Sequence, residues 1–310
     1  MPTCKLTRLS VEYNLTEHCN LNCYACDHAS PLLPRKFASV EEFSRDFTAL
    51  ARVFHSRQLR ILGGEPLLHP KLLKFLTEAR RIGIADELVL ITNGVLLHEA
   101  SEELWELIDE LWVSAYPGVN RRLNDTQCAE ICKAHGVRFH LMRVDSFNRT
   151  IINNRIDDPK LVKAIFRNCK LAGEISCHTV HEGRFYKCAI APFMGSRLAL
   201  RGITFDNRKV DGVSLHNNPK LYQDLDRCLN GPTPLAACSY CLGSLGPLVA
   251  HRQLNRDGRS HWLEEDNRPD IEGVARLWRV KWPVTSSTVM SVRRGWQRIT
   301  GGILRRLGSG

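Results

Sequence analysis

The chain has 310 residues, a formal net charge of +10 and the charged and apolar fractions of a globular protein, and this length allows one large domain or two modest ones. It has neither an apolar run long enough to span a bilayer nor the apolar block of a signal peptide at its start. We therefore expect a cytoplasmic protein whose 12 cysteines include metal ligands rather than a disulfide framework. The basic excess comes mainly from the segment after Glu272, so we expect no nucleic-acid partner.

The first predicted element is a strand over residues 6–15, where polar and apolar residues alternate. It leads into a loop with Cys19, Cys23 and Cys26, in the pattern CxxxCxxC. Three thiolates at this spacing can hold three irons of a four-iron cubane and leave the fourth iron open to a chelating ligand. A zinc finger is the alternative, but the second ligand pair that a finger needs does not follow at finger spacing.

Strands and helices then alternate along the chain. Strands are predicted over 58–62, 87–91, 111–116 and 137–144, and helices over 39–54, 70–82, 101–108 and 125–135. Repeated strand–helix units produce a parallel sheet, and five or six of them make most of a barrel. Cys128 and Cys132 lie four residues apart on one helix, and we interpret them as core residues rather than metal ligands.

Two further motifs stand at strand ends. Gly63-Gly64-Glu65-Pro66 follows the strand 58–62, and Thr92-Asn93-Gly94 ends the strand 87–91. In this order after CxxxCxxC, the motifs resemble those of the radical S-adenosylmethionine (SAM) superfamily, and the resemblance covers roughly residues 6–245. It implies an α/β fold with a partial, TIM-like (βα)6 barrel. It also implies a 4Fe–4S cluster held by Cys19, Cys23 and Cys26, with SAM bound at the open iron.

The resemblance also implies which residues hold SAM. Glu65 would bind the amino group, because a carboxylate buried beside a cluster needs a cationic partner, and the two glycines before it would let the backbone approach the ligand closely. At the ends of the fourth and fifth strands, Ser114 and Arg143 match positions that touch the SAM ribose and carboxylate, although polar residues are also ordinary at strand ends. The family's aromatic residue before the third cysteine is replaced here by Ala25, with Tyr24 one place earlier. The predicted cofactor-binding set is Tyr24, Gly63, Gly64, Glu65, Thr92, Asn93 and Ser114, and the catalytic candidate is Arg143.

The second half carries another set of cysteines. Cys169 and Cys188 flank a predicted hairpin that turns at Glu182-Gly183, after a short helix over 160–168, and a CxxC pair follows at Cys238 and Cys241. On spacing alone, four such thiolates fit a zinc site and an iron–sulfur site equally well. The pattern CxnGx4C resembles that of SPASM and twitch domains, which append auxiliary clusters to radical SAM barrels. It implies a second, auxiliary 4Fe–4S cluster on the four cysteines, although Cys177 or Cys228 could replace one of them.

These patterns predict three segments. The radical SAM core covers 1–158, and residues 159–250 contain the last barrel elements and a small cysteine-rich hairpin/helix domain of the twitch type. The segment 251–310 is a basic tail. In the tail, apolar residues recur every three or four positions with arginines between them, which is typical of an amphipathic helix at a membrane surface. The apolar positions are Val289, Val292, Trp296, Ile299, Ile303 and Leu307. A helix packed on the barrel, or a disordered basic end, is the alternative to contact with the inner face of a membrane.

The resemblance implies cleavage of SAM to a 5′-deoxyadenosyl radical that removes a substrate hydrogen. The single-twitch layout resembles the aminocyclitol dehydrogenases of butirosin antibiotic biosynthesis, so we expect oxidation of a sugar or cyclitol alcohol to a ketone. A ribosomal-peptide maturase that forms a thioether or carbon–carbon crosslink remains an alternative. So do a sugar epimerase, in which Cys177 or Cys228 returns a hydrogen, and a non-enzymatic zinc module. Expected partners are a sugar-like molecule or a peptide, and an electron donor such as flavodoxin or ferredoxin.

Overall fold

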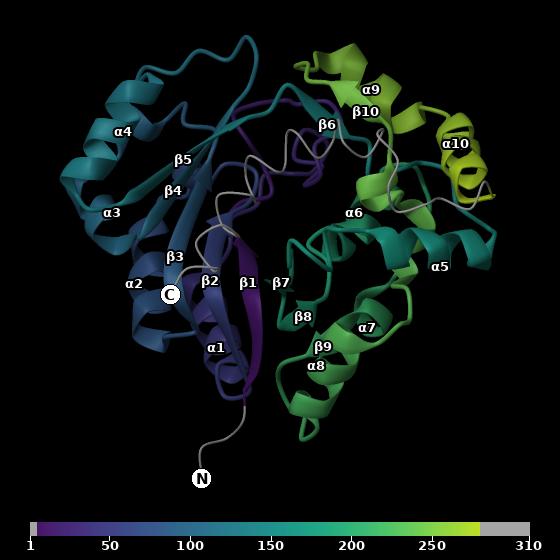
Figure 1. Ribbon diagram of the computed structural model, residues 1–310, viewed down its shortest axis with the longest axis horizontal. Coiled ribbons are helices and arrows are strands. Elements are labelled where there is room, and N and C mark those ends of the chain that lie inside the picture. Colours follow the sequence, from purple (N-terminus) through teal and green to yellow (C-terminus); the bar gives the residue numbers. More distant parts are fainter. Residues whose placement is uncertain (1–4, 280–310) are drawn as a thin grey trace, which may run out of the picture.

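The fold is organised around one eight-stranded sheet, shown in Figure 1, a computed structural model that describes residues 5–279. Five strands run parallel in the order β5-β4-β3-β2-β1. They are β1 (Leu6–Asn14), β2 (Phe54–Leu62), β3 (Ala85–Thr92), β4 (Glu110–Ala115) and β5 (Arg138–Arg143). Beyond β1 the sheet continues with β7 (Thr179–His181), β8 (Arg184–Tyr186) and β9 (Gly212–Ser214). The predicted α/β class, with the mostly parallel sheet of a partial barrel, is confirmed.

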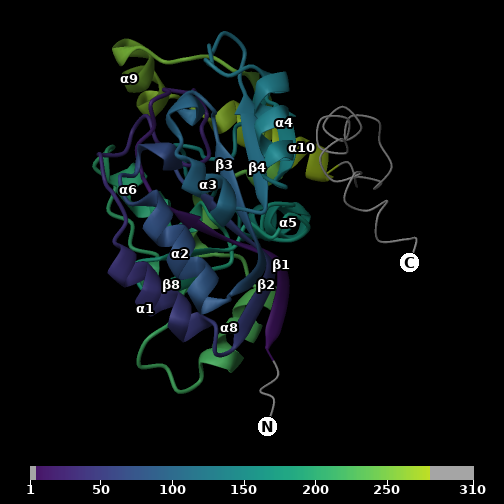
Figure 2. The same ribbon diagram turned by 90° about the vertical axis from the view of Figure 1, so that its left-hand side faces the viewer.

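Four helices connect the parallel strands and cover one face of the sheet, as Figures 1 and 2 show. They are α1 (Val40–Leu50), α2 (Leu72–Ile82), α3 (Glu102–Leu107) and α4 (Asp125–Ala134). Tyr13 of β1 packs against Phe43, Phe47 and Phe75, with ring centroids 4.9 to 6.0 Å apart. Each buried side chain of this size contributes about 1.5–3 kcal/mol, so this aromatic cluster fixes α1 and α2 on the sheet.

Helix α1 is shorter than the predicted helix, which extended to Phe54. Ser39 caps its first turn as predicted, since its hydroxyl accepts a backbone N–H at 3.3 Å. The helix ends at Leu50 and β2 begins at Phe54. The helix ends early because these residues make tertiary contacts with β1. The N–H of Leu6 donates to the carbonyl of Val53 at 2.9 Å, and Leu6 pairs with Phe54 in the sheet. Strand pairing outweighs the helical pattern of these residues.

Two further predictions are confirmed by packing and backbone geometry. Cys128 and Cys132 of α4 are 1% and 0% exposed and belong to the main hydrophobic core. The hairpin of β7 and β8 turns at Glu182 and Gly183, whose φ angles are 45° and 73°. A two-residue hairpin turn with positive φ at both positions matches the twist of its strands.

The second half adds short elements around this hairpin. Its helices are α5 (Pro159–Asn168), α6 (Met194–Ala199), α7 (Arg208–Asp211), α8 (Leu221–Asn230), α9 (Arg256–Glu264) and α10 (Arg268–Arg279). A separate antiparallel pair joins β6 (Ser146–Asn148) to β10 (Leu248–Ala250). Because β7 pairs with β1, residues after 158 complete the main sheet. The division of the chain at 158 and 250 stays a prediction.

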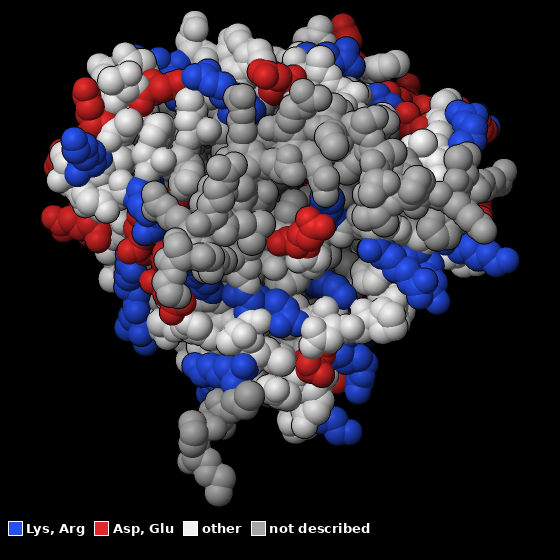
Figure 3. Space-filling model, in the orientation of Figure 1, with Lys and Arg blue, Asp and Glu red and all other residues white. Residues whose placement is uncertain are grey.

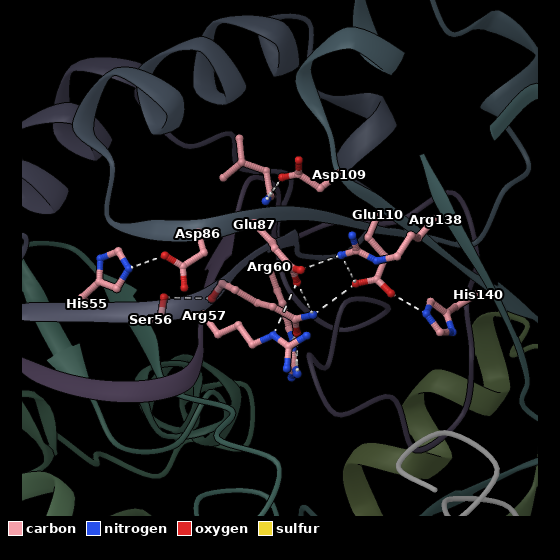
Figure 4. A network of polar contacts seen from close by, with 12 residues as sticks. His55, Ser56, Arg57, Arg60, Asp86, Glu87, Asp109, Glu110, Arg138 and His140 are labelled. Atoms are coloured by element: carbon pink, nitrogen blue, oxygen red, sulfur yellow. Dashed lines mark hydrogen bonds and ion pairs between the residues drawn. The ribbon is translucent and has the colours of Figure 1, made fainter. Parts of the chain in front are cut away.

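The face of the sheet opposite the helices is polar. Strand residues alternate, so Leu59, Ile61 and Leu90 pack under the helices while Gln58 and Arg60 point to the other face. Figure 4 shows the polar network on that face. Its contacts join the amide of Gln58 to Glu87 (3.3 Å) and Glu110 (3.1 Å), and the guanidinium of Arg138 to Glu87 (2.9 Å). His140 contacts Glu110 as well. Charged and amide groups therefore line the inside of the partial barrel.

None of the described helices is long and apolar enough to cross a membrane. Basic and acidic side chains are interspersed over much of the described surface in Figure 3. The predicted amphipathic stretch from Val289 to Leu307 lies outside the described residues.

Candidate active site

The loop after β1 brings the three cysteines of the first motif into one site. The pKa of Cys19 is raised to about 12 by burial, and the nearby Glu65, Cys26 and Cys23 raise it further. Burial likewise raises the pKa of Cys26 to about 12, with the neighbouring Cys23 adding to the effect. All three thiols therefore lie within electrostatic range of one another. Since buried thiols ionise reluctantly, holding them as thiolates requires bound metal cations.

The Gly63-Gly64 turn packs directly against this loop. Gly63 has a φ of 137°, and a Cβ there would lie 2.5 Å from the carbonyl oxygen of Thr16. A Cβ on Gly64 would lie 1.9 Å from the carbonyl oxygen of His18. Glycine is required at both positions because the chain's own backbone occupies that space. The cysteine loop makes this close approach to the two glycines, and their predicted role in binding SAM stays a prediction.

Glu65 is a fully buried carboxylate at 0% exposure. One oxygen accepts from the hydroxyl of Thr92 at 2.7 Å and the N–H of Leu67 at 3.0 Å, and the other accepts from the N–H of Asn93 at 2.9 Å. Burial raises its pKa to about 7, and in the described part of the chain no cationic side chain contributes to that pKa. A buried carboxylate without a protein cation is suited to bind an ammonium group.

The Thr92-Asn93-Gly94 motif ties this carboxylate to the cysteine loop. The side-chain amide of Asn93 donates to Asn20 Oδ1 at 2.7 Å and lies 3.6 Å from Cys19 Sγ. Ser114, buried at the end of β4, is hydrogen-bonded to Tyr116. Tyr116 itself lies close to all three cysteines, since each of them adds to the burial that raises its pKa. Six of the predicted residues, and Tyr116, therefore gather at the carboxyl ends of β1 to β4.

Two predicted residues are engaged elsewhere. The hydroxyl of Tyr24 donates to Glu265 at 2.7 Å and accepts from Arg149 at 2.8 Å, and its ring packs edge-on against Trp262. Arg143, at the end of β5, has a side chain 71% exposed and paired with Asp125 at 3.1 Å. Their predicted roles in binding SAM and in catalysis remain predictions.

Sequence reasoning missed a segment that crosses the cysteine loop, residues 251–254. It runs antiparallel to residues 22–24, with Tyr24 N–H donating to the Arg252 carbonyl at 2.9 Å and Leu254 N–H donating to the Asn22 carbonyl at 2.7 Å. We assigned these residues to the basic tail. A pairing between segments more than 200 residues apart leaves no periodic signal in either one.

The second set of cysteines also gathers in one site, which is partly buried. Burial raises the pKa of Cys238 to about 12, with Cys169 adding to the effect. Burial raises the pKa of Cys188 and Cys241 as well, and each is within electrostatic range of the other three thiols. A Cβ on Gly243 would lie 2.6 Å from Cys169 Sγ, so a glycine is needed beside this site.

The two remaining candidates have other polar partners. Cys177 is hydrogen-bonded to Glu12 near Arg60, although it also lies within range of Cys188. Cys228 lies near Lys187 and Asp211. In residues 5–279, no three His, Cys, Asp or Glu side chains form the compact arrangement of a single-ion site.

The fold and this site define an α/β protein with a partial barrel and a thiol-lined loop at its mouth. The radical SAM superfamily model matches residues 13–182, and the chain belongs to this superfamily. The family implies a 4Fe–4S cluster with SAM, and the residues fit that group. Three thiols of one loop, Cys19, Cys23 and Cys26, would hold three irons. The uncompensated carboxylate of Glu65 would hold the ammonium of SAM.

Several curated relatives are similar over about a third of the chain's length. The chain is 32% identical over 98 residues to the GTP 3′,8-cyclase of Rhodopirellula baltica, which is 31% of this chain and 27% of the relative. It is 34% identical over 94 residues to the GTP 3′,8-cyclase of Heliobacterium modesticaldum, 29% of this chain and 28% of the relative. The match thus spans about a quarter of the length of these relatives.

Solved structures resemble the chain over more of its length. The crystal structure of BtrN in complex with AdoMet and 2-DOIA is 18% identical, with a TM-score of 0.46, covering 79% of this chain and 96% of BtrN. The structure of anSMEcpe with bound AdoMet is 14% identical, with a TM-score of 0.45, covering 87% of this chain and 99% of that one. Similarity at this level does not define a substrate.

Proposed function

We propose that this radical SAM enzyme is an oxidoreductase that converts an alcohol of a sugar or cyclitol to a ketone. One observation carries the proposal: the thiols of Cys169, Cys188, Cys238 and Cys241 lie within electrostatic range of one another in one partly buried site. Four protein thiolates would ligate every iron of an auxiliary 4Fe–4S cluster. Such a cluster has no open position for SAM or substrate, and this favours a role in electron transfer.

Converting an alcohol to a ketone releases one hydrogen atom, one proton and one electron. When bound, SAM and the first cluster supply hydrogen-atom abstraction, and a second cluster supplies an electron acceptor. The residues of this chain bind and orient the reactants. Glu65 neutralises the ammonium of SAM, and Thr92 and Asn93 hold that carboxylate in place.

The polar inner face of the sheet supports a polyhydroxylated or amino-substituted substrate. Carboxylate, amide, guanidinium and imidazole groups line it (Figure 4), although Glu110 and Arg138 stand at the amino ends of β4 and β5, away from the cysteine loop. Arg60 and Glu12 extend this lining toward the carboxyl ends of the strands, 3.7 Å apart and both buried. Asn14 ends β1, and its buried Oδ1 accepts no hydrogen bond from the described residues. Groups of this kind recognise hydroxyls and amines by hydrogen bonds.

The experiment uses full-length protein reconstituted anaerobically, with SAM, dithionite and a panel of sugars and cyclitols deuterated at single carbons. The expected result is a ketone, with deuterium in 5′-deoxyadenosine and one SAM consumed per ketone. Changing Cys238 and Cys241 to serine should preserve SAM cleavage and abolish the ketone. We expect flavodoxin or ferredoxin to replace dithionite as the electron donor.

Other products would overturn the proposal in identifiable ways. An inverted sugar that carries one deuterium after turnover in D2O, and is lost in a Cys177→Ala or a Cys228→Ala protein, would indicate an epimerase. A crosslinked peptide would indicate a maturase. Zinc content with no SAM cleavage would indicate a non-enzymatic zinc module.

A further inference from the structure

The segment that crosses the cysteine loop places two side-chain donors on one sulfur. Gln253 Nε2 and His251 Nε2 each lie 3.3 Å from Cys23 Sγ. Cys23 is 7% exposed, so these contacts are shielded from bulk water. Neither residue belongs to a family motif named above, and neither acts on Glu65 or its partners.

The two side chains are held in place independently of the sulfur. Gln253 Oε1 accepts the Asn22 N–H at 2.7 Å, which fixes the amide so that its nitrogen faces Cys23. The ring of His251 stacks on Tyr116 at a centroid distance of 4.8 Å and an interplanar angle of 19°. Backbone bonds at Tyr24 and Leu254 hold the segment itself. The donors are therefore preorganised.

The Gln253 amide nitrogen also lies 3.1 Å from His251 Nε2, so the direction of the contacts at this nitrogen depends on the imidazole tautomer. The Gln253 amide nitrogen is a donor in every case. His251 Nδ1 is buried without a partner, and an orphaned N–H is rarer than an orphaned acceptor. On this ground we assign the imidazole hydrogen to Nε2, where it points at Cys23, whereas in the other tautomer Nε2 would accept from the Gln253 amide. Both residues then donate N–H···S bonds to one thiolate.

We infer that Gln253 and His251 are positioning residues that orient the Cys23 thiolate and raise the reduction potential of the cluster bound by the loop. The inference depends on Cys23 being a ligand of that cluster. Reduction adds negative charge to cluster and sulfurs, and N–H donors stabilise the more negative state. Because SAM cleavage begins with a reduced cluster, this segment of the chain would ease the reduction.

The experiment measures the midpoint potential of the SAM-responsive cluster by EPR-monitored redox titration of the full-length reconstituted protein. Gln253→Met removes one donor without adding charge. His251→Phe removes the other and keeps an aromatic ring to stack on Tyr116. Both variants should titrate at more negative potentials than the parent, and the double variant lower still. A tenfold change in the reduction equilibrium would correspond to about 59 mV for this one-electron couple.

Arg252→Lys is the matched control. Arg252 lies between the two donors, but its guanidinium packs over the Tyr24 ring at 4.2 Å and the substitution keeps its charge. The potential of this variant should equal that of the parent. Gln253→Glu is a second test at the same position, because it keeps an acceptor for Asn22 while replacing the donor, and its potential should fall further than that of Gln253→Met.

Two results would overturn the inference. One is an unchanged potential in the iron-loaded Gln253 and His251 variants. The other is loss of iron from both Gln253 variants while Arg252→Lys and His251→Phe keep theirs at an unchanged potential. That pattern would leave the segment a purely structural role.

Discussion

Glu65 is the residue on which cofactor binding should depend most directly. Replacing it with glutamine keeps the size and removes the charge that would face the ammonium of SAM. Hydrogen bonds to charged groups contribute about 1.5–3 kcal/mol, so the affinity for SAM should fall by about 10- to 100-fold. Calorimetric titration of SAM into anaerobically reconstituted protein measures this change. Glu87→Gln, in the network of the inner face, is the control, and equal affinities for the parent and Glu65→Gln would contradict the role.

The same carboxylate predicts a pH dependence of folding in the cofactor-free protein. Its folded pKa of about 7 lies above the ordinary value of 4.5. The unfolded chain therefore loses this proton first as pH rises, and the associated stability is complete below pH 4.5 and lost through pH 7. The difference amounts to at most about 3 kcal/mol.

Denaturant unfolding at several pH values measures this effect. The free energy of unfolding of the parent should decline more between pH 5 and pH 8 than that of Glu65→Gln. Parallel pH profiles for the two proteins would show that another group is responsible.

At the scale of elements, the sequence predicts the structural features that depend on a local residue pattern. The alternation of β1, the Ser39 cap and the Glu182-Gly183 turn are set by neighbouring residues, and the structure has all three. The end of α1 at Leu50 and the pairing of residues 251–254 with the cysteine loop depend on segments distant in the sequence. In the site, the motifs identified Glu65 and its partners, whereas Gln253 and Tyr116 belong to no motif.

The packing of two loops leads to a prediction for Gly64→Ala. The added Cβ would lie 1.9 Å from the His18 carbonyl oxygen, and its three nearest atoms all belong to the backbone of His18 and Cys19. The loop that carries Cys19 must shift, so we expect iron loading to fall severely and the free energy of unfolding to drop by about 1–3 kcal/mol. Gly273→Ala is the control, because nothing lies within 4 Å of its added Cβ. That helical position should gain about 0.5–1 kcal/mol. A Gly64→Ala protein with full iron content would refute the close-packing argument.

At the scale of the whole molecule, the two thiol sites should load iron independently. They use different segments: one loop after β1 holds the first set, while the second set combines the ends of the hairpin region with the CxxC pair. Reconstituted protein should therefore hold about eight irons if both clusters contain four. Changing Cys19, Cys23 and Cys26 to alanine should leave about half of that iron.

The single change Cys23→Ala should already abolish formation of 5′-deoxyadenosine, because the cubane then lacks one of three protein ligands. Iron analysis and Mössbauer spectroscopy read the count, and chromatography of the SAM products reads the cleavage. If the triple-alanine protein held no iron, the chain would have no second cluster. The proposed dehydrogenation would then lack the electron acceptor that it requires. Continued SAM cleavage by Cys23→Ala would show that the first set is not the ligand set. If the triple-alanine protein keeps about half of the iron and Cys23→Ala no longer cleaves SAM, SAM cleavage is assigned to the first set of thiols and the remaining iron to the second set. Each measurement responds to a different set of thiols.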